Sequence, residues 1–350
     1  MAHCPHASWW KRVSRAALAQ SPRVSVLTAT FNAAGFIETT LASALRQTFG
    51  DFELVVIDDG SSDGTVEVVA RLMAADARIR LIRQMNRGPS ATRNRAILES
   101  RGELIAFLDH DDLWLPDKLA RQVALIDARP EVGVVSCYSA VIDARHRCLG
   151  WRLGGDVNGD VADEMIEWDM VSGGSVALMR REALEQVGHL DETLRFREDW
   201  DLWIRLARHV RFATVPCTLV GYTRSPGSES RNYQQMALEG QRVLEKARRD
   251  DPRVTTQRLR FCQARDLFAM AVFCAIDGEV SAAWRFLRRS VATSPAPVLR
   301  SPKRWAFVGV LILQTILPPA AFARVFGLLN RMSFHLQPGQ PFHQLADVQR

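Results

Sequence analysis

Residues 52–64 have the sequence FELVVIDDGSSDG, and this stretch decides the fold. The run from Phe52 to Ile57 is apolar and rich in β-branched residues, which is typical of a strand buried on both faces. Two aspartates and a glycine, Asp58-Asp59-Gly60, follow it directly. In an open α/β sheet, the residues that follow a buried strand lie at the edge where ligands bind. The stretch therefore predicts a parallel sheet with a ligand site at its carboxyl edge.

The same pattern continues on both sides of this stretch. Further strands are expected at 24–30, 79–83 and 104–108, with helices at 37–47, 64–75 and 90–100. Strands that alternate with helices of this length indicate right-handed βαβ units and a mainly parallel sheet. Beyond residue 132 the pattern is less regular, with strands expected at 133–139, 175–179 and 212–222 and an acidic, Trp-rich helix at 197–208.

Charge is distributed unevenly along the 350 residues. The formal net charge of +6 divides into −6 over residues 23–228, +3 over residues 1–22 and +9 over residues 229–350. An acidic middle with basic ends is typical of a metal-using body whose termini meet an anionic partner. Charge alone leaves anionic lipid, nucleic acid and a merely solvated basic surface open.

The six cysteines form no CxxC pair and no Cys/His cluster with zinc spacing, which favours a reducing, cytoplasmic setting. The basic tail at 1–22 lacks the apolar region of a secretory signal. No Lys/Arg pattern interleaved with a nucleic-acid-binding module is evident, so nucleic acid is not an expected partner.

The C-terminal third looks helical after a Ser/Gly/Pro-rich break at 225–230, with apolar repeats at 234–246 and 259–276. The stretch 305–326 is strongly apolar but is interrupted by Gln314 and by Pro318-Pro319, with Lys303-Arg304 before it. We interpret 303–330 as a helix that lies in a membrane interface with basic flanks. A core helix of the C-terminal region and a single membrane span are the alternatives.

An acidic cluster, Asp109-His110-Asp111-Asp112, closes the strand at 104–108. Three carboxylates within four residues repel one another unless a cation is present. Mg²⁺ and Mn²⁺ prefer oxygen ligands and commonly share them with substrate phosphates. The cluster thus predicts a metal site, with a solvated acidic loop and a helix cap at Asp112 as the alternative.

Three further segments allow two interpretations each. Asp58 or Asp59 could accept a hydrogen bond from a nucleobase N–H, or the loop could form an Asx turn that caps the next helix through Asp63 or Ser62. Gly88 and Arg93, at a strand-to-helix junction, could bind phosphate or form a basic surface turn. A carboxylate at the start of the 197–208 helix could deprotonate an acceptor hydroxyl or simply complement the helix dipole.

Together these segments resemble the family-two glycosyltransferases over about residues 23–225. The resemblance rests on the order and spacing of seven motifs, which are Thr30-Phe31-Asn32, Gln47-Thr48-Phe49, Asp58-Asp59-Gly60-Ser61, Ala91-Thr92-Arg93-Asn94, Asp109-His110-Asp111-Asp112, Trp114-Leu115-Pro116-Asp117-Lys118-Leu119 and Glu198-Asp199. It implies an α/β GT-A fold with a mainly parallel central sheet flanked by helices. It also implies a nucleotide-sugar half at 23–128, an acceptor half at 129–225 and a helical C-terminal region at 226–350.

The resemblance also implies roles for individual residues. On the donor side it implies Thr30 and Asn32 along the nucleoside and Asp59 on the base, with Asp58 and Arg93 nearby. Asp109 and Asp111 would be the metal pair, and Asp199 the general base with Glu198 beside it. The acceptor side would be formed by Gly173, Gly174 and Trp200.

The implied activity is inverting transfer of a single sugar from a nucleotide-diphosphate donor to a hydroxyl acceptor, with Mn²⁺ or Mg²⁺ as cofactor. A UDP-sugar donor, a carbohydrate or glycolipid acceptor and a role in bacterial surface polysaccharide or glycolipid assembly are expected, and no oligomeric state is implied. The alternative is a nucleotide-sugar-binding partner protein without turnover. A dinucleotide oxidoreductase is disfavoured because the first strand lacks a GxGxxG loop.

Overall fold

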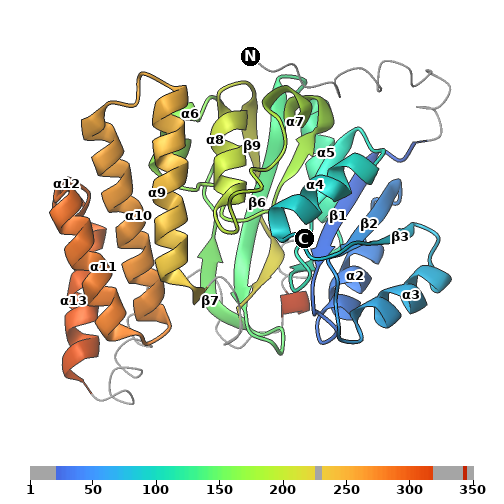
Figure 1. Cartoon of the computed structure of the whole chain (residues 1–350), viewed down its shortest axis with the longest axis horizontal. Coiled ribbons are helices and arrows are strands. Elements are labelled where there is room, and N and C mark those ends of the chain that lie inside the picture. Colours follow the sequence, from blue (N-terminus) through green and yellow to red (C-terminus); the bar gives the residue numbers. More distant parts are fainter. Residues whose placement is uncertain (1–20, 225–230, 318–341, 345–350) are drawn as a thin grey trace.

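A computed structural model describes residues 21–224, 231–317 and 342–344. Its centre is one nine-stranded sheet with the order β3-β2-β1-β4-β8-β6-β9-β5, and β7 pairs with β6 (Figure 1). The strands are β1 (Val24–Thr30), β2 (Phe52–Asp58), β3 (Ile79–Arg83), β4 (Leu104–Phe107), β5 (Leu113–Trp114), β6 (Val132–Ile142), β7 (Cys148–Leu153), β8 (Leu178–Arg180) and β9 (Arg211–Thr223).

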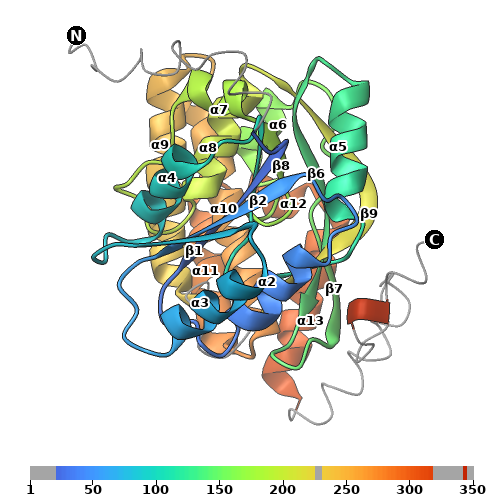
Figure 2. The ribbon, with the colours of Figure 1, turned by 90° about the vertical axis from the view of Figure 1, so that its right-hand side faces the viewer.

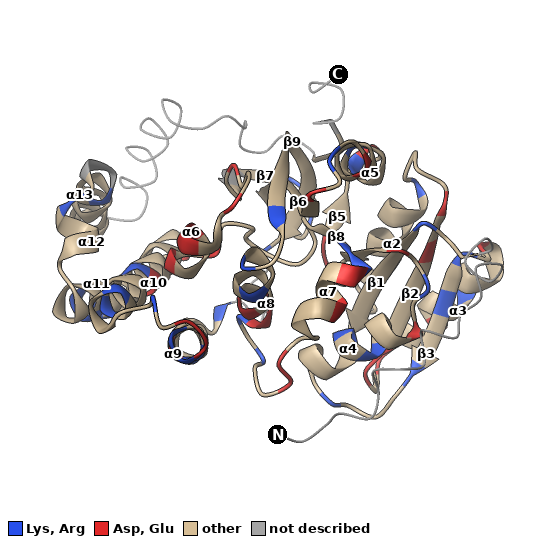
Figure 3. Ribbon diagram, turned by 90° about the horizontal axis from the view of Figure 1, so that it is seen from above, with Lys and Arg blue, Asp and Glu red and all other residues tan. Residues whose placement is uncertain are grey.

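The first half of the sheet is parallel, as the sequence predicts. Strands β1, β2, β3 and β4 pair in parallel, and β1 lies between β2 and β4. The strand order therefore reverses at β1, which makes its carboxyl end the expected ligand crevice. Right-handed crossovers in opposite directions place helices on opposite faces. Figure 3 accordingly shows α2 (Ile37–Leu45) and α4 (Pro89–Glu99) on opposite sides of β1 and β2, while α3 (Thr65–Ala75) packs against α2.

The second half of the sheet is mixed. Strand β8 is antiparallel to both β4 and β6, and β9 is parallel to β6 but antiparallel to β5. The strand predicted at 175–179 begins three residues later, at Leu178, because residues 174–177 form a turn closed by a hydrogen bond from the Ala177 N–H to the Gly174 carbonyl. The helices here are α5 (Lys118–Ala128), α6 (Ala162–Glu167), α7 (Arg181–Val187) and α8 (Glu198–Ala207).

The C-terminal helices form a layer beyond α8, on the far side from β1 to β3 (Figures 1 and 2). They are α9 (Tyr233–Asp250), α10 (Thr256–Ile276), α11 (Val280–Thr293), α12 (Ala296–Leu299) and α13 (Pro302–Ile316). Val243, Leu244, Leu259 and Cys262 belong to the same buried core as the sheet, and a second core joins α9 to α13. Helices α9 and α10 therefore contribute to both the core of the sheet and the core of the outer helices α11 to α13. The domain boundary near residue 225 stays a prediction.

The apolar stretch at 305–326 is described only in part. Helix α13 contains its first portion, with Leu311 buried and Trp305, Ile312 and Ile316 exposed. The remainder from residue 318, like the basic tail at 1–20, lies outside the described residues. Among the helices of the described ranges, none combines the length and apolar character that crossing a membrane requires.

Candidate active site

Arg93 connects the two halves of the domain at the carboxyl edge of the sheet. One of its guanidinium nitrogens, Nη2, lies 2.6 Å from Asp109 Oδ1 at the end of β4. The other, Nη1, donates to Glu198 Oε1 at the start of α8. Its side chain is only 17 % exposed, so both ion pairs are largely withdrawn from water. Two acidic segments far apart in the sequence thus meet at the side chain of one arginine.

Burial dominates the electrostatics of this cluster. It would raise the pKa of Asp109, but the charge and hydrogen bond of Arg93 bring that pKa below its ordinary value. For Glu198, burial outweighs Arg93 and raises the pKa to about 7, while the charge of Asp199 adds to the increase. Burial also raises the pKa of Asp199, against the opposing charges of Arg93 and Arg197. Both carboxyl groups at the start of α8 are therefore shifted towards the neutral form, which is a common property of groups at functional sites.

A further carboxyl, Asp169, belongs to this group and was not predicted. Burial, and next the charge of Asp199, raise its pKa to about 7. Asp169 Oδ1 accepts hydrogen bonds from the backbone N–H groups of Val171 and Ser172, 3.2 and 2.9 Å away. It begins the loop that leads to Gly173 and Gly174. No motif of the sequence signals this position, because its partner Asp199 is brought near only by folding.

The protein itself occupies only part of the oxygen atoms of the predicted metal pair and its neighbour. Burial, together with the charge of Asp109, raises the pKa of Asp111, so a negative charge there lacks sufficient compensation from the protein. Asp109 uses Oδ1 for Arg93, and Asp112 Oδ1 accepts from the Thr223 N–H at 3.0 Å. Within the described ranges no three Asp, Glu, His or Cys side chains are grouped as a complete metal site. The carboxylate oxygens of Asp109 and Asp111 are the ligand type that a hard cation prefers, and metal binding by this pair stays a prediction.

The donor-side residues predicted around β1 and β2 are held mainly by their own loops. Asp59 is buried, and its carboxylate accepts from the backbone N–H groups of Arg87 and Gly88, both at 2.9 Å. Asp58 Oδ2 accepts from the Ser61 N–H at 3.3 Å. The Asp59 carboxylate also accepts from Gln84 Nε2 at 2.8 Å, so three hydrogen bonds already tie it to the segment before α4, and a base contact by Asp59 stays a prediction.

The turn after β2 also contains the Asx arrangement that was the alternative interpretation. Asp63 Oδ1 accepts from the Thr65 N–H at 3.0 Å. Asn32 has a positive φ of 48° and accepts from the Ser62 N–H at 2.9 Å through Oδ1. The Thr30 hydroxyl is buried and has no hydrogen-bond partner among the described residues. These contacts fasten the end of β1 to the turn after β2, which shapes the crevice at the switch point.

The acceptor side predicted from Gly173 and Gly174 lies against the end of β4. Gly173 has φ of 121°, a conformation that favours glycine, and a Cβ atom at Gly174 would be 3.5 Å from the Phe107 Cβ. The next residue, Ser175, accepts a hydrogen bond from the Asp109 N–H at 3.0 Å through its Oγ. This loop therefore lies directly beside the proposed metal pair.

Trp200 does not form part of an acceptor surface, contrary to expectation. Its side chain is 1 % exposed, and its Nε1–H donates to the Met165 carbonyl at 2.8 Å. The amphipathic pattern of α8 requires this, because its Trp-rich face packs into the core. The indole thus fixes α8 against α6 and leaves any acceptor contact to other residues.

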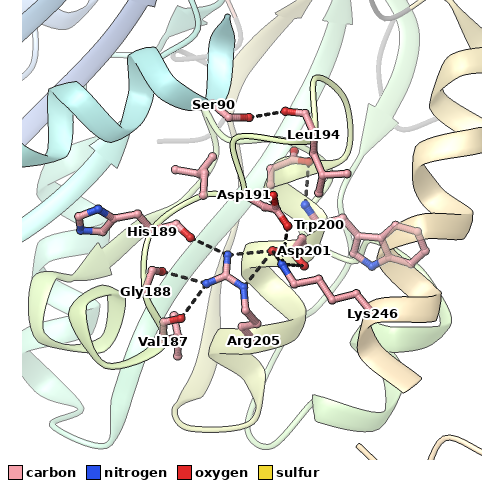
Figure 4. Close-up of polar contacts among 12 residues, drawn as sticks. Ser90, Val187, Gly188, His189, Asp191, Leu194, Trp200, Asp201, Arg205 and Lys246 are labelled. Atoms are coloured by element: carbon pink, nitrogen blue, oxygen red, sulfur yellow. Dashed lines mark hydrogen bonds and ion pairs between the residues drawn. The ribbon is translucent and has the colours of Figure 1, made fainter. Parts of the chain in front are cut away.

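Helix α4 holds the segment before α8 in place. The side chains that do so follow Gly88, in the stretch that the sequence offered as a phosphate site or a basic surface turn. Ser90 Oγ donates to the Leu194 carbonyl (Figure 4), and Asn94 exchanges two hydrogen bonds with the backbone of Leu190 at 2.9 and 3.0 Å. Ser90, Arg93 and Asn94 share one face of α4, as residues three and four apart do. Arg93 is engaged by two carboxylates, and its contact with phosphate stays a prediction.

Comparison with known proteins identifies the segment that carries most of these residues. Residues 25–188, from β1 to the end of α7, match the model of glycosyl transferase family 2. This segment belongs to glycosyl transferase family 2. The family 2 segment contains the residues at the ends of β1, β2 and β4, whereas Glu198 and Asp199 lie beyond its end at residue 188.

The curated relatives that match this chain are also described as glycosyltransferases. An uncharacterized glycosyltransferase of Nostoc sp. is 31% identical over 188 residues, which are 52% of this chain and 56% of the relative. The putative teichuronic acid biosynthesis glycosyltransferase TuaG of Bacillus subtilis is 38% identical over 31% of this chain and 43% of its own length. The chain thus spans about half the length of the curated relatives it matches.

Solved structures show that the fold is GT-A. Staphylococcus aureus TarS 1–349 in complex with UDP superposes with a TM-score of 0.56 at 20% identity, over 74% of each chain. A mannosyltransferase of Pyrobaculum calidifontis in complex with GDP-Man and Mn²⁺ superposes with a TM-score of 0.57 at 22% identity, over 95% of this chain and 88% of that one. The second match extends beyond the family 2 segment into the C-terminal helices.

Proposed function

We propose that this protein is an inverting glycosyltransferase that moves one sugar from a nucleotide-diphosphate donor to a hydroxyl group of a carbohydrate or glycolipid acceptor. One observation supports this most: Arg93 ties Asp109 to Glu198 and so brings the candidate base Asp199 to the same buried acidic centre as the candidate metal pair. A metal side and a base side from different elements are what displacement at an anomeric carbon requires.

The chemistry assigns a separate task to each side. Mn²⁺ or Mg²⁺, held by Asp109 and Asp111 when bound, would stabilise the charge that gathers on the departing diphosphate. On the opposite side Asp199 would accept the proton of the acceptor hydroxyl as its oxygen attacks. The raised pKa of Asp199 makes it a better proton acceptor than an exposed aspartate. Arg93 would keep the two sides in register through its paired contacts.

Donor and pathway are proposed from the relatives. TarS is in complex with UDP in one structure and UDP-GlcNAc in another, and the Pyrobaculum mannosyltransferase is in complex with GDP-Man and Mn²⁺. TuaG is named for teichuronic acid biosynthesis. We propose a UDP-sugar as donor and a bacterial surface polysaccharide or glycolipid as product.

A donor screen tests the proposed function. The protein is incubated with UDP-glucose, UDP-galactose, UDP-N-acetylglucosamine and GDP-mannose, with Mn²⁺, Mg²⁺ or EDTA, and nucleotide release is measured. We expect release from at least one donor with a divalent ion and none with EDTA. Tight nucleotide binding without release or transfer would instead favour the non-catalytic partner protein.

The outer helices support a contact with anionic lipid on the cytoplasmic face of the membrane. Trp305, Ile312 and Ile316 are exposed and lie on one side of α13. Helix α11, which packs against α13, exposes Arg285, Arg288 and Arg289. An exposed apolar face on one helix, with exposed basic side chains on the helix packed against it, matches an anionic bilayer surface. The five described cysteines are free, which fits a reducing compartment.

The double substitution of Trp305→Ala with Ile316→Ser should reduce membrane binding. We expect the wild type to sediment with phosphatidylglycerol vesicles at low salt and the variant to lose most of that binding, because the apolar contact area is removed. The matched control is Leu238→Ser, which removes an equally exposed apolar residue from α9. Equal sedimentation of the wild type and the double variant would reject the membrane contact.

A further inference from the structure

The turn before the candidate base contains one residue with an unusual backbone conformation. Arg197, the N-cap of α8, is in the left-handed region with φ of 62°. This conformation is unfavourable for a residue with a side chain and persists only where its surroundings impose it. The direction in which α8 presents Glu198 and Asp199 depends on this turn.

Helix α9 fastens the turn through a buried carboxylate. Glu239 Oε2 accepts hydrogen bonds from two consecutive backbone N–H groups, those of Arg195 at 2.8 Å and Phe196 at 2.7 Å. Glu239 itself is only 2 % exposed. A buried carboxylate that receives two backbone donors holds both peptide groups in a fixed orientation.

Helix α10 holds the next residue, Arg197, through the carboxylate of Asp266. Arg197 Nη2 lies 2.7 Å from Asp266 Oδ1, and the exposed fractions of the two side chains are 11% and 6%. The same guanidinium lies over the Trp200 ring, 5.5 Å from its centroid. The two helices that provide these carboxylates follow the break after β9, outside the segment that matches the family.

The close approach of α9 to Asp266 depends on a glycine. A Cβ atom at Gly240 would be 2.5 Å from Asp266 Oδ2, closer than real atoms come. Because Gly240 lacks a side chain, Asp266 can lie between α9 and Arg197.

Lys246 makes a second link from α9, to Asp191 at 2.8 Å and to Asp201 at 3.1 Å. Arg205 also donates to Asp201, and to the carbonyl groups of Val187, Gly188 and His189 (Figure 4).

We infer that Glu239 and Asp266 are positioning residues for the reaction, because they fix the left-handed turn at Arg197 and thereby the direction of the Asp199 carboxylate. The C-terminal helices α9 and α10 are then part of the catalytic unit. This inference rests on the proposed function and adds to it. It assigns the base-positioning contacts to a part of the chain that carries no family motif.

Asp266→Asn tests the inference, with Asp251→Asn as its matched control. Asp251 is an equally buried aspartate that caps α9 and pairs with Arg208, at the opposite end of α8 from Asp199. Nucleotide release from UDP-N-acetylglucosamine and GDP-mannose with MnCl₂ gives kcat and KM, and titration with UDP and GDP gives nucleotide affinity. We expect Asp266→Asn to lower kcat about 10–100-fold, as a misplaced catalytic group does, with nucleotide affinity unchanged. Asp251→Asn should keep the wild-type kcat even if its melting temperature falls.

A second variant covers the case in which Asp266→Asn does not fold. Gly240→Ala keeps every charge and adds a residue of high helix propensity, but its Cβ displaces the Asp266 carboxylate. It should show the same loss of kcat at unchanged nucleotide affinity. Two outcomes overturn the inference, judged on whichever of the two variants fold. In the first, the variants keep the kcat of Asp251→Asn; in the second, they lose nucleotide affinity and kcat by equal factors. Failure of the proposed function would look different, because the wild type itself would then release no nucleotide.

Discussion

Asp199→Asn is expected to abolish sugar transfer while nucleotide binding stays at the wild-type level. The amide preserves the shape of the side chain and can still accept from the backbone N–H of Trp200, which lies 2.7 Å from Asp199 Oδ1 in the wild type. It cannot accept a proton from an acceptor hydroxyl. Loss of a general base typically costs about 10²–10⁴-fold in rate. Transfer is measured as nucleotide release with the donor that the screen selects, and binding by calorimetric titration with the nucleotide.

The stability of this variant separates a chemical role from a structural one. Asp199 lies among Glu198, Asp169 and Asp109, and burial raises its pKa, so its charge is not favoured by the fold. The neutral amide should therefore keep or increase the melting temperature. Equal losses of nucleotide binding and transfer would contradict the assignment and indicate a structural role.

The pH dependence of the wild-type rate is a second test of the role of Asp199. A general base acts in its ionised form, so the rate should fall as the pH decreases through the pKa of Asp199. Because burial raises that pKa, the fall should occur above the value of about 3.9 that is ordinary for aspartate. Glu198 and Asp169, with pKa values of about 7, titrate in the same cluster. The acid limb of kcat/KM against pH measures this group as a whole.

Asp111→Ala should remove the dependence of activity on a divalent ion together with most of the activity. We expect a loss of about 10²-fold or more, comparable to removal of one group that stabilises transition-state charge. The measurement is nucleotide release against Mn²⁺ concentration, where the variant should show no saturable activation. The physical reason is that burial and Asp109 leave the charge of Asp111 without sufficient compensation from the protein.

The neighbouring Asp112 provides the control for this experiment. Its carboxylate accepts from the Thr223 N–H, a contact that the amide oxygen of Asp112→Asn can reproduce. Asp112→Asn should therefore keep activation by Mn²⁺ near the wild-type concentration. A variant Asp111→Ala with wild-type turnover, or an Asp112→Asn variant with the same defect as Asp111→Ala, would show that the metal assignment is wrong.

Much of the first half of the fold could be read from local patterns. The buried runs at 24–30, 52–57, 79–83 and 104–108 lie at or within one residue of the strands β1 to β4, since apolar β-branched runs bounded by turn residues fit few other structures. The acidic clusters after two of these strands were correctly placed at the carboxyl edge, because parallel strands end at the same edge. Helix α8 was also predicted to within one residue at each end.

The sequence by itself therefore determined the strands and helices of the first half of the fold, the edge where the site lies and the residue types available there. Only the tertiary structure decided which of those residues meet. Arg93 pairs with Glu198 across 105 residues, Asp169 lies near Asp199, and Trp200 turns into the core. Helices α9 and α10 hold the turn at Arg197 through Glu239 and Asp266. Local patterns cannot specify such contacts, because they arise when distant segments bury their surfaces together, and no single segment contains both partners.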